Sequence, residues 1–65
     1  MIEVTRINDS TIMINADLIE TVEETPDTVI TLANGRKYIV TERAEEIKSK
    51  VIEYKKKIFS GIIFK

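Results

Sequence analysis

The densest group of residues that could do chemistry is acidic: Glu20, Glu23, Glu24 and Asp27 lie close together in the middle of the chain. Paired carboxylates can exchange protons in acid/base catalysis, and carboxylate oxygens can bind a divalent cation. Charged side chains on strands and loops more often keep a sheet edge soluble and unpaired. We therefore interpret this group as a surface feature and predict neither catalysis nor a metal site.

The remaining composition excludes several common reaction types. The sequence contains no histidine and no cysteine, so it can form no Ser-His or Cys-His nucleophile and no imidazole or thiolate metal site. Its two glycines, Gly35 and Gly61, are too few for a phosphate-binding loop. We expect a protein that is not an enzyme and that uses no cofactor.

The charge balance gives little support to nucleic-acid binding, although a small β-rich regulator of that kind is the alternative reading. Ten basic and 11 acidic residues leave a formal net charge of -1, whereas nucleic-acid-binding surfaces carry excess positive charge. Tyr38 is the only aromatic residue before residue 50 that could stack on a base. The candidate phosphate contacts are Arg6, Arg36, Lys37, Arg43, Lys55, Lys56 and Lys57.

The elements that must position these residues centre on a predicted meander of three strands between Asp17 and Val40. Asn34-Gly35 is typical of a two-residue type I′ turn, because both residues tolerate positive φ. Such a turn would place Thr31 opposite Tyr38, Ile30 opposite Ile39 and Val29 opposite Val40.

The other turn of the meander contains Pro26, which cannot donate to a sheet and therefore belongs in a loop. A three-residue loop over 25–27 would set Val22 opposite Ile30. The predicted core row across the three strands is then Val22, Ile30 and Ile39. A two-residue loop would shift the register by one and turn Val22 to the other face.

The whole chain of 65 residues predicts a single α+β domain: a small antiparallel sheet or partly closed barrel followed by one amphipathic helix. A domain this small buries little apolar surface, so we expect help from self-association or a larger partner. The predicted strands are 2–7, 11–14, 18–24, 28–33 and 36–41, the helix is 42–59, and an apolar tail covers 61–65.

The predicted helix follows from a change of period after Val40. Ala44, Ile47, Val51, Tyr54 and Ile58 are spaced three or four residues apart and form one apolar stripe. Thr41 is the expected N-cap, and Gly61 is the expected C-terminal stop.

The apolar C-terminus leaves two alternatives open. Phe59, Ile62, Ile63 and Phe64 could fold back onto the domain, or they could meet a partner, a second subunit or a membrane surface. With the three lysines before them they would form a basic amphipathic segment. Because the sequence shows no signal peptide and no apolar run long enough to span a bilayer, we expect a cytoplasmic protein, with peripheral contact at the inner face of the membrane.

The order of these motifs resembles the bacterial flagellar FlbD family, which is also described as swarming motility protein SwrD. The residues that carry the resemblance are the start Met1-Ile2-Glu3-Val4-Thr5-Arg6-Ile7-Asn8, then Asn15, Asp17-Leu18-Ile19-Glu20, Glu24-Thr25-Pro26-Asp27-Thr28, Val29-Ile30-Thr31-Leu32 and Asn34-Gly35-Arg36-Lys37-Tyr38, followed by the Glu/Lys-rich helix. One departure is the first turn, Asn8-Asp9-Ser10, where the family tends to have Asn-Gly.

The resemblance implies a non-enzymatic accessory of flagellar motility that is linked to swarming and to motor power, and it supplies no active site. We expect it to contact motor or stator components, with homo-oligomerisation as a further option. Because one helix can cover only one face of a sheet, the expected partner surface combines the second sheet face with the C-terminal segment. Its residues are Val29, Tyr38, Val40, Phe59, Ile62, Ile63 and Phe64.

Overall fold

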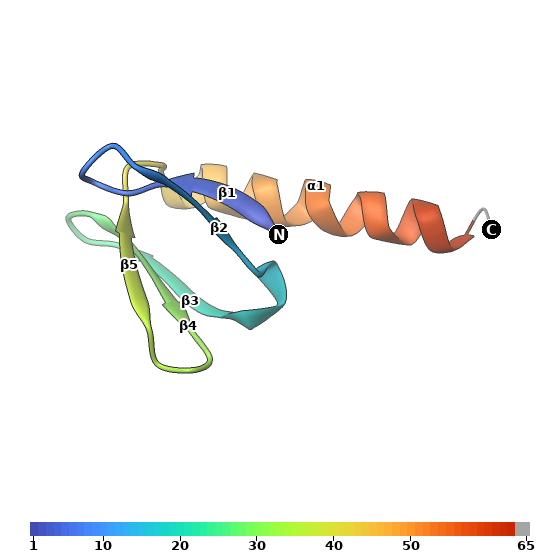
Figure 1. Cartoon of the computed structure of the whole chain (residues 1–65), viewed down its shortest axis with the longest axis horizontal. Helices are drawn as coiled ribbons and strands as arrows, with labels where there is room; N and C mark the ends of the chain where they lie inside the picture. The colour runs from blue at the N-terminus through green and yellow to red at the C-terminus, as the bar shows by residue number, and fades with distance from the viewer. Residues whose placement is uncertain (64–65) are drawn as a thin grey trace.

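The computed structural model describes the backbone of residues 1–63 and the side chains of residues 1–58, and it confirms the α+β class. Two antiparallel sheets that do not close into a barrel are followed by one helix (Figure 1). The elements are β1 (Ile2–Thr5), β2 (Thr11–Ile14), a 3-10 turn η1 (Ala16–Leu18), β3 (Ile19–Glu24), β4 (Thr28–Leu32), β5 (Lys37–Val40) and α1 (Ala44–Ile63).

The two sheets, β1-β2 and β3-β4-β5, meet at a single point along their edges. Arg6 forms an isolated antiparallel bridge with Val40, and the Thr41 N–H donates to the Thr5 carbonyl at 2.8 Å. Beyond this bridge β1 turns away into β2, so β5 is left as an open edge. The result is a bent, partly open arrangement.

The hairpin register predicted from Asn34-Gly35 is wrong by one residue. The Gly35 N–H donates to the Leu32 carbonyl at 2.9 Å and the Leu32 N–H to the Arg36 carbonyl at 2.8 Å, so the loop has three residues. Of the two residues Asn34 and Gly35, only Gly35 takes a positive φ, of 89°, while the Asn34 side chain accepts from the Arg36 N–H at 3.0 Å. This is a type I turn followed by a glycine bulge, a turn that the same dipeptide also supports.

The shifted register changes which residues share a face of the meander. Ile30 lies opposite Tyr38 and Val29 opposite Ile39, so the core row is Val22, Ile30 and Tyr38 instead of ending at Ile39. The three-residue loop at 25–27 is confirmed, because Val22 does pair with Ile30.

A β-bulge near Glu20 gives β3 two inward residues at a spacing that a regular strand would not allow. Ile19 pairs with Leu32, but Thr21 already pairs with Thr31, so one extra residue is accommodated between them. As a result Ile19 and Val22 both pack against the core, although a spacing of three would place them on opposite faces of a regular strand.

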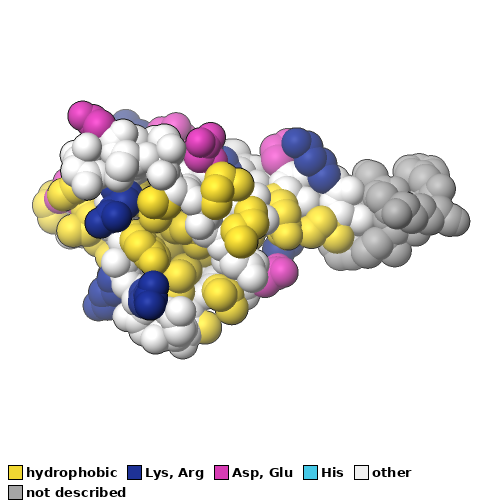
Figure 2. Space-filling view, in the orientation of Figure 1, with side chains coloured by type: hydrophobic (Ala, Val, Ile, Leu, Met, Phe, Trp, Pro, Cys, Tyr) yellow, Lys and Arg dark blue, Asp and Glu magenta, His cyan; other side chains and the backbone are white. Residues whose placement is uncertain are grey.

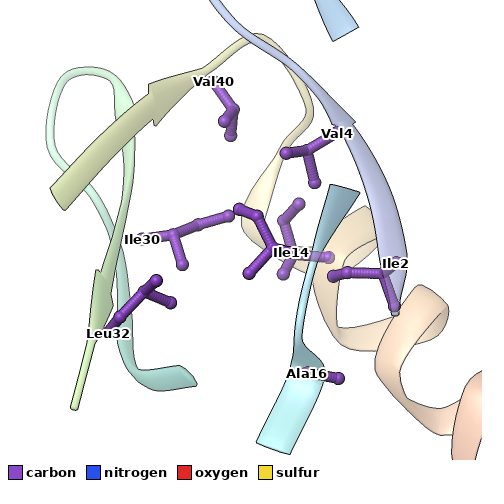
Figure 3. Close-up of a cluster of buried hydrophobic side chains, with 8 residues drawn as sticks. Ile2, Val4, Ile14, Ala16, Ile30, Leu32 and Val40 are labelled. Atoms are coloured by element: carbon purple, nitrogen blue, oxygen red, sulfur yellow. The ribbon is translucent and has the colours of Figure 1, made fainter. Parts of the chain in front are cut away.

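The core lies between the two sheets and is covered on one side by the first half of α1. Side chains from β1, β2, η1, β4 and β5 converge there (Figure 3). The buried apolar residues are Ile2, Val4, Ile14, Ala16, Ile30, Leu32, Val40 and Ile47.

The helix begins and ends later than predicted. It starts at Ala44 instead of residue 42, so Thr41 is not its N-cap, and Gly61 lies inside it because a glycine only weakens a helix by about 1 kcal/mol. The apolar stripe packs on the core as far as Tyr54. Ile58 is 40% exposed, because the second half of α1 runs past both sheets (Figure 1).

The β1-β2 hairpin repeats the turn of the β4-β5 hairpin with a less suitable residue at its left-handed position. The Asp9 N–H donates to the Arg6 carbonyl at 2.9 Å and the Arg6 N–H to the Ser10 carbonyl at 2.8 Å, so Asp9 takes the place that Gly35 has in the other turn. Asp9 has a φ of 70°. The backbone of a residue that has a Cβ atom is strained in this left-handed region of φ.

We predict that Asp9→Gly raises the free energy of unfolding by about 0.5–1 kcal/mol and that Gly35→Ala lowers it by about 1 kcal/mol. Urea denaturation monitored by circular dichroism measures both. Asp9→Ala is the control, because it removes the carboxylate but keeps the Cβ. If Asp9→Ala were as stabilising as Asp9→Gly, backbone strain would not be the cause.

Candidate functional site

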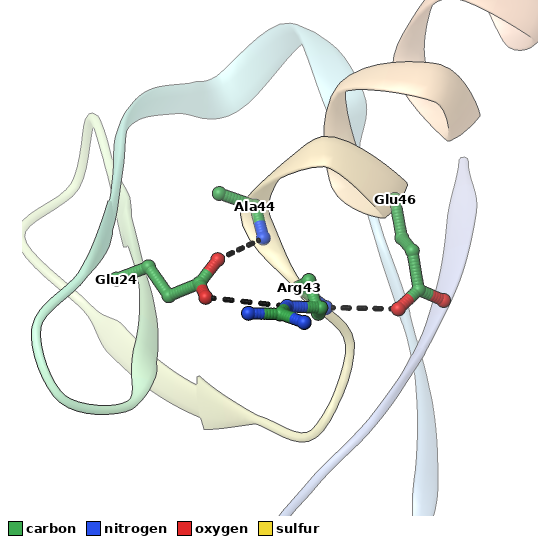
Figure 4. A network of polar contacts seen from close by, with 4 residues as sticks. All are labelled: Glu24, Arg43, Ala44 and Glu46. Atoms are coloured by element: carbon green, nitrogen blue, oxygen red, sulfur yellow. Dashed lines mark hydrogen bonds and ion pairs between the residues drawn. The ribbon is translucent and has the colours of Figure 1, made fainter.

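The acidic group on β3 and the loop after it has a structural role through one of its members. The Glu24 carboxylate accepts from the Ala44 N–H at 2.8 Å, and its other oxygen lies 3.5 Å from the Arg43 Nε (Figure 4). The Glu46 carboxylate turns back to accept from the Arg43 N–H at 3.1 Å. Glu24 therefore supplies, from a neighbouring strand, a negative charge and an acceptor at the N-terminus of α1.

The other acids of this group, Glu20, Glu23 and Asp27, are exposed. Among the side chains that the structure describes, no three acids are placed to hold a metal ion. The geometry assigns Glu24 to helix capping, which a single sequence does not reveal because the acceptor and the donor are 20 residues apart.

A second carboxylate, that of Glu42, fastens the loop after β5 to the edge of β1. Its two oxygens lie 2.9 and 3.0 Å from the Thr5 nitrogen, whose N–H they accept. Partial burial acts to raise the pKa of Glu42, but hydrogen bonds from backbone N–H groups, chiefly that of Thr5, and the nearby Lys50 charge outweigh it and hold the pKa below 4.5. We call Thr5, Thr41 and Glu42 the edge clasp.

A groove of about 240 Å³ lies beside the edge clasp, between the β1-β2 turn and the start of β5. It brings together two of the predicted basic residues, Arg6 and Lys37, with the predicted aromatic Tyr38. Ile7, Asn8 and Ile39 complete its lining. Figure 2 shows Lys and Arg side chains beside hydrophobic ones on this side of the molecule. Arg36 lies one residue before Lys37, whereas Arg43 lies in the loop before α1 and the helix lysines lie on α1.

A second groove, of about 330 Å³, lies between the start of β1 and the middle of α1. Met1, Ile2 and Tyr54 give it apolar walls, and its rim carries charges of both signs. The rim residues are Glu3, Ser49, Lys50, Glu53 and Lys57.

The predicted partner surface on the sheet does not form one face. Val40 is 3% exposed and lies in the core, and Tyr38 is half-buried on the same inward side. Val29 lies on the opposite face, where its cross-strand neighbour is Ile39. The grouping of Val29 with Tyr38 and Val40 was therefore wrong, because it rested on the predicted hairpin register, which differs from the observed one by one residue.

The predicted C-terminal contact residues, Phe59, Ile62, Ile63 and Phe64, lie outside the side chains that the structure describes. Sequence reasoning missed two exposed apolar residues near β5, Ile7 at 62% and Ile39 at 41%. Ile7 was assigned to a strand, but it lies in the β1-β2 turn. The turn-forming residues Asn8 and Asp9 that follow it could have indicated this.

The comparison with family models decides the membership of the chain. The model of the FlbD family, described as flagellar and swarming motility proteins, matches residues 1–59. The chain belongs to the FlbD family. Neither the curated proteins nor the solved structures contain a match.

Membership gives this FlbD-family chain a role in flagellar and swarming motility and confirms the resemblance seen in its sequence. The family is not known for enzymatic activity. Within the described residues, no helix has the length and apolar character needed to cross a bilayer.

We predict that Glu24→Ala lowers the free energy of unfolding by about 1 kcal/mol, because the first N–H of α1 loses its acceptor and the helix end its negative charge. Glu23→Ala is the matched control, since Glu23 is exposed and its carboxylate accepts none of the hydrogen bonds found among the described side chains, whereas that of Glu24 accepts from Ala44. Thermal unfolding of both variants measures the difference. Equal losses would show that Glu24 does not cap the helix.

The lowered pKa of Glu42 predicts an acid-sensitive edge clasp. A carboxylate whose pKa is lowered by folding contributes stability above its unfolded pKa, near 4.5, and this stability is lost as the pH falls through the folded pKa. At pH 7, Glu42→Ala should cost about 1–2 kcal/mol, since the Thr5 N–H loses its acceptor. Well below pH 4 the difference between wild type and variant should shrink.

Urea titrations at pH 7 and pH 3 measure this difference. Glu45→Ala serves as the control, because Glu45 is exposed at the same end of the helix. A stability difference for Glu42→Ala that stays the same at both pH values would contradict the clasp.

Proposed function

We propose that this FlbD-family chain supports flagellar motor power during swarming as a non-enzymatic accessory that acts through protein–protein contact. The family match supports the motility role, and the observation that carries the contact is the exposed apolar surface around β5. The proposed partner is a motor or stator component at the cytoplasmic face of the membrane. Self-association of the chain is a further proposed mode of contact.

The sheet surface proposed for this contact contains Ile7, Val29 and Ile39. Val29 and Ile39 are cross-strand neighbours on the outward face of the three-stranded sheet, and Ile7 lies beside Ile39 at the wall of the groove. Exposed apolar side chains that lie together mark interaction sites more often than single ones do. Tyr38 borders this surface from the groove.

The C-terminal segment is the second proposed contact. Its sequence places Phe59, Ile62, Ile63 and Phe64 after three lysines, and the helix that carries the first three of them runs past the sheets. A basic amphipathic end of this kind can meet an apolar groove of a partner or the surface of an anionic membrane. It would bring the chain to the inner face of the membrane.

The test is in-cell photo-crosslinking in a flagellated host whose own copy has been replaced. A photoreactive residue at position 39 or 64 should capture a motor or stator protein, whereas the same residue at position 20, on the exposed bulge of β3, should not. Ile39→Ser should reduce the swarming rate and the motor torque, and Glu20→Ser should leave both unchanged.

Normal torque in cells that lack the protein would rule out a role in motor power. Crosslinks from position 39 that are no stronger than those from position 20 would rule out the sheet contact. These two outcomes are separable, because the first concerns the role and the second concerns the surface.

A further inference from the structure

The groove beside the edge clasp is the vacant continuation of β1 along the edge of β5. β1 pairs with β5 only through the Arg6–Val40 bridge, after which residues 7–9 form the hairpin turn. By the register of that bridge Ile7 stands opposite Ile39, so the edge of β5 faces the groove at Lys37, beyond Ile7.

The direction of the hydrogen bonds shows which backbone groups of β5 point into this space. The Arg36 carbonyl accepts from Leu32 on β4, and backbone groups alternate in direction along a strand, so Lys37 and Ile39 direct theirs to the opposite edge. The Thr41 N–H, which has the same direction, reaches the Thr5 carbonyl of β1. Among the backbone hydrogen bonds of the described residues outside the strand ladders, none is donated by the N–H groups of Lys37 or Ile39.

The walls of the groove have a defined chemistry. Arg6 and Lys37 are exposed cations that form no ion pair within the described part of the chain. Ile7 and Ile39 offer apolar contacts, and Tyr38 closes the floor from the core side. A free strand edge, two cations and two isoleucines therefore surround one space.

We propose that this groove binds an extended acidic peptide segment, which adds to β5 as a further strand. Main-chain hydrogen bonds to the outward backbone groups of Lys37 hold the segment beyond Ile7, its carboxylates meet Arg6 and Lys37, and its apolar side chains contact Ile7 and Ile39. The inference rests on the proposed protein–protein function and names the kind of segment that the partner must present.

Two other occupants fit this space less well. A second copy pairing β5 with β5 in antiparallel fashion would bring Arg6, Arg36 and Lys37 of both copies together, and like charges at close range oppose that. A nucleic acid would gain few phosphate contacts and one half-buried aromatic ring, and it could not use the strand edge.

The larger groove beside α1 does not discriminate between peptide segments by their charge. Its rim pairs Glu3 and Glu53 with Lys50 and Lys57, so its charge favours neither an acidic nor a basic segment.

The experiment titrates the full chain with a ten-residue peptide of alternating Val and Glu. Binding is monitored by NMR through the backbone amide signals. The signals of Lys37 and Ile39 should shift most. Lys37→Glu should weaken binding at least roughly tenfold, because a charge-assisted hydrogen bond is replaced by repulsion. Lys48→Glu, on the exposed face of α1, is the matched control and should change binding little.

Three further probes make the outcome decisive. A peptide with Lys in place of Glu should not bind, and methylation of alternate peptide amides should abolish binding by removing the strand hydrogen bonds. A single-stranded ten-nucleotide RNA that binds tighter than the acidic peptide, with a steep salt dependence, would overturn the proposal. So would peptide binding that Lys37→Glu and Lys48→Glu weaken equally, or a chain that dimerises through these amides instead.

Failure here is distinguishable from failure of the proposed function. If the peptide does not bind but crosslinking from position 39 still captures a motor protein, the proposed function stands and the strand-addition mode is wrong. If the peptide binds as expected while cells lacking the protein have normal torque, the groove stands and the motor role is wrong.

Discussion

The edge clasp is the interaction on which the rest of the architecture depends. β1 and β5 meet at one bridge, and among the described residues the hydrogen bonds of Thr5 with Thr41 and Glu42 lie beside it and hold the two sheets together. This junction sets the space between the sheets, which the buried residues of both fill. The clasp also sets where α1 starts, because Glu42 lies two residues before it.

Glu24 completes this arrangement from the other sheet. The N-terminus of α1 receives Glu24 from β3, while the loop before it is held on β1 by Glu42. The N-terminal end of the helix is therefore anchored to both sheets by polar contacts, in addition to the packing of its apolar stripe. Such contacts add stability to a chain whose core is small. It also explains why Thr41 does not cap the helix: its N–H and hydroxyl both point to the Thr5 carbonyl.

The sequence predicted those features that depend on local pattern. The strand positions, the three-residue loop around Pro26, the apolar stripe from Ala44 to Tyr54 and the family all follow from residue order and spacing.

The register at Asn34-Gly35 was wrong because this dipeptide suits two turns that differ by one residue, and the choice between them depends on which of Tyr38 and Ile39 the opposite sheet can cover. The roles of Glu24 and Glu42 need contacts between distant elements, and a single sequence carries no signal for them. The candidate groove was out of reach for the same reason, although Arg6, Lys37 and Tyr38 had each been noted for their chemistry.

The open edge of β5 and the turn at Asp9 are two consequences of one local choice. A longer β1 would continue along β5 past Ile7, cover Lys37 and move the arrangement towards a closed barrel. The chain instead turns within residues 7–9, although this places Asp9 at a strained φ of 70°. Strain of this kind is kept where the surrounding structure or function requires it. Here the early turn leaves a short strand edge open between two cations, and the exposed like charges of Arg6 and Lys37 disfavour pairing of that edge with the same edge of a second copy. The same two positive charges that disfavour pairing of this edge between free copies also favour an acidic strand as the segment that covers it.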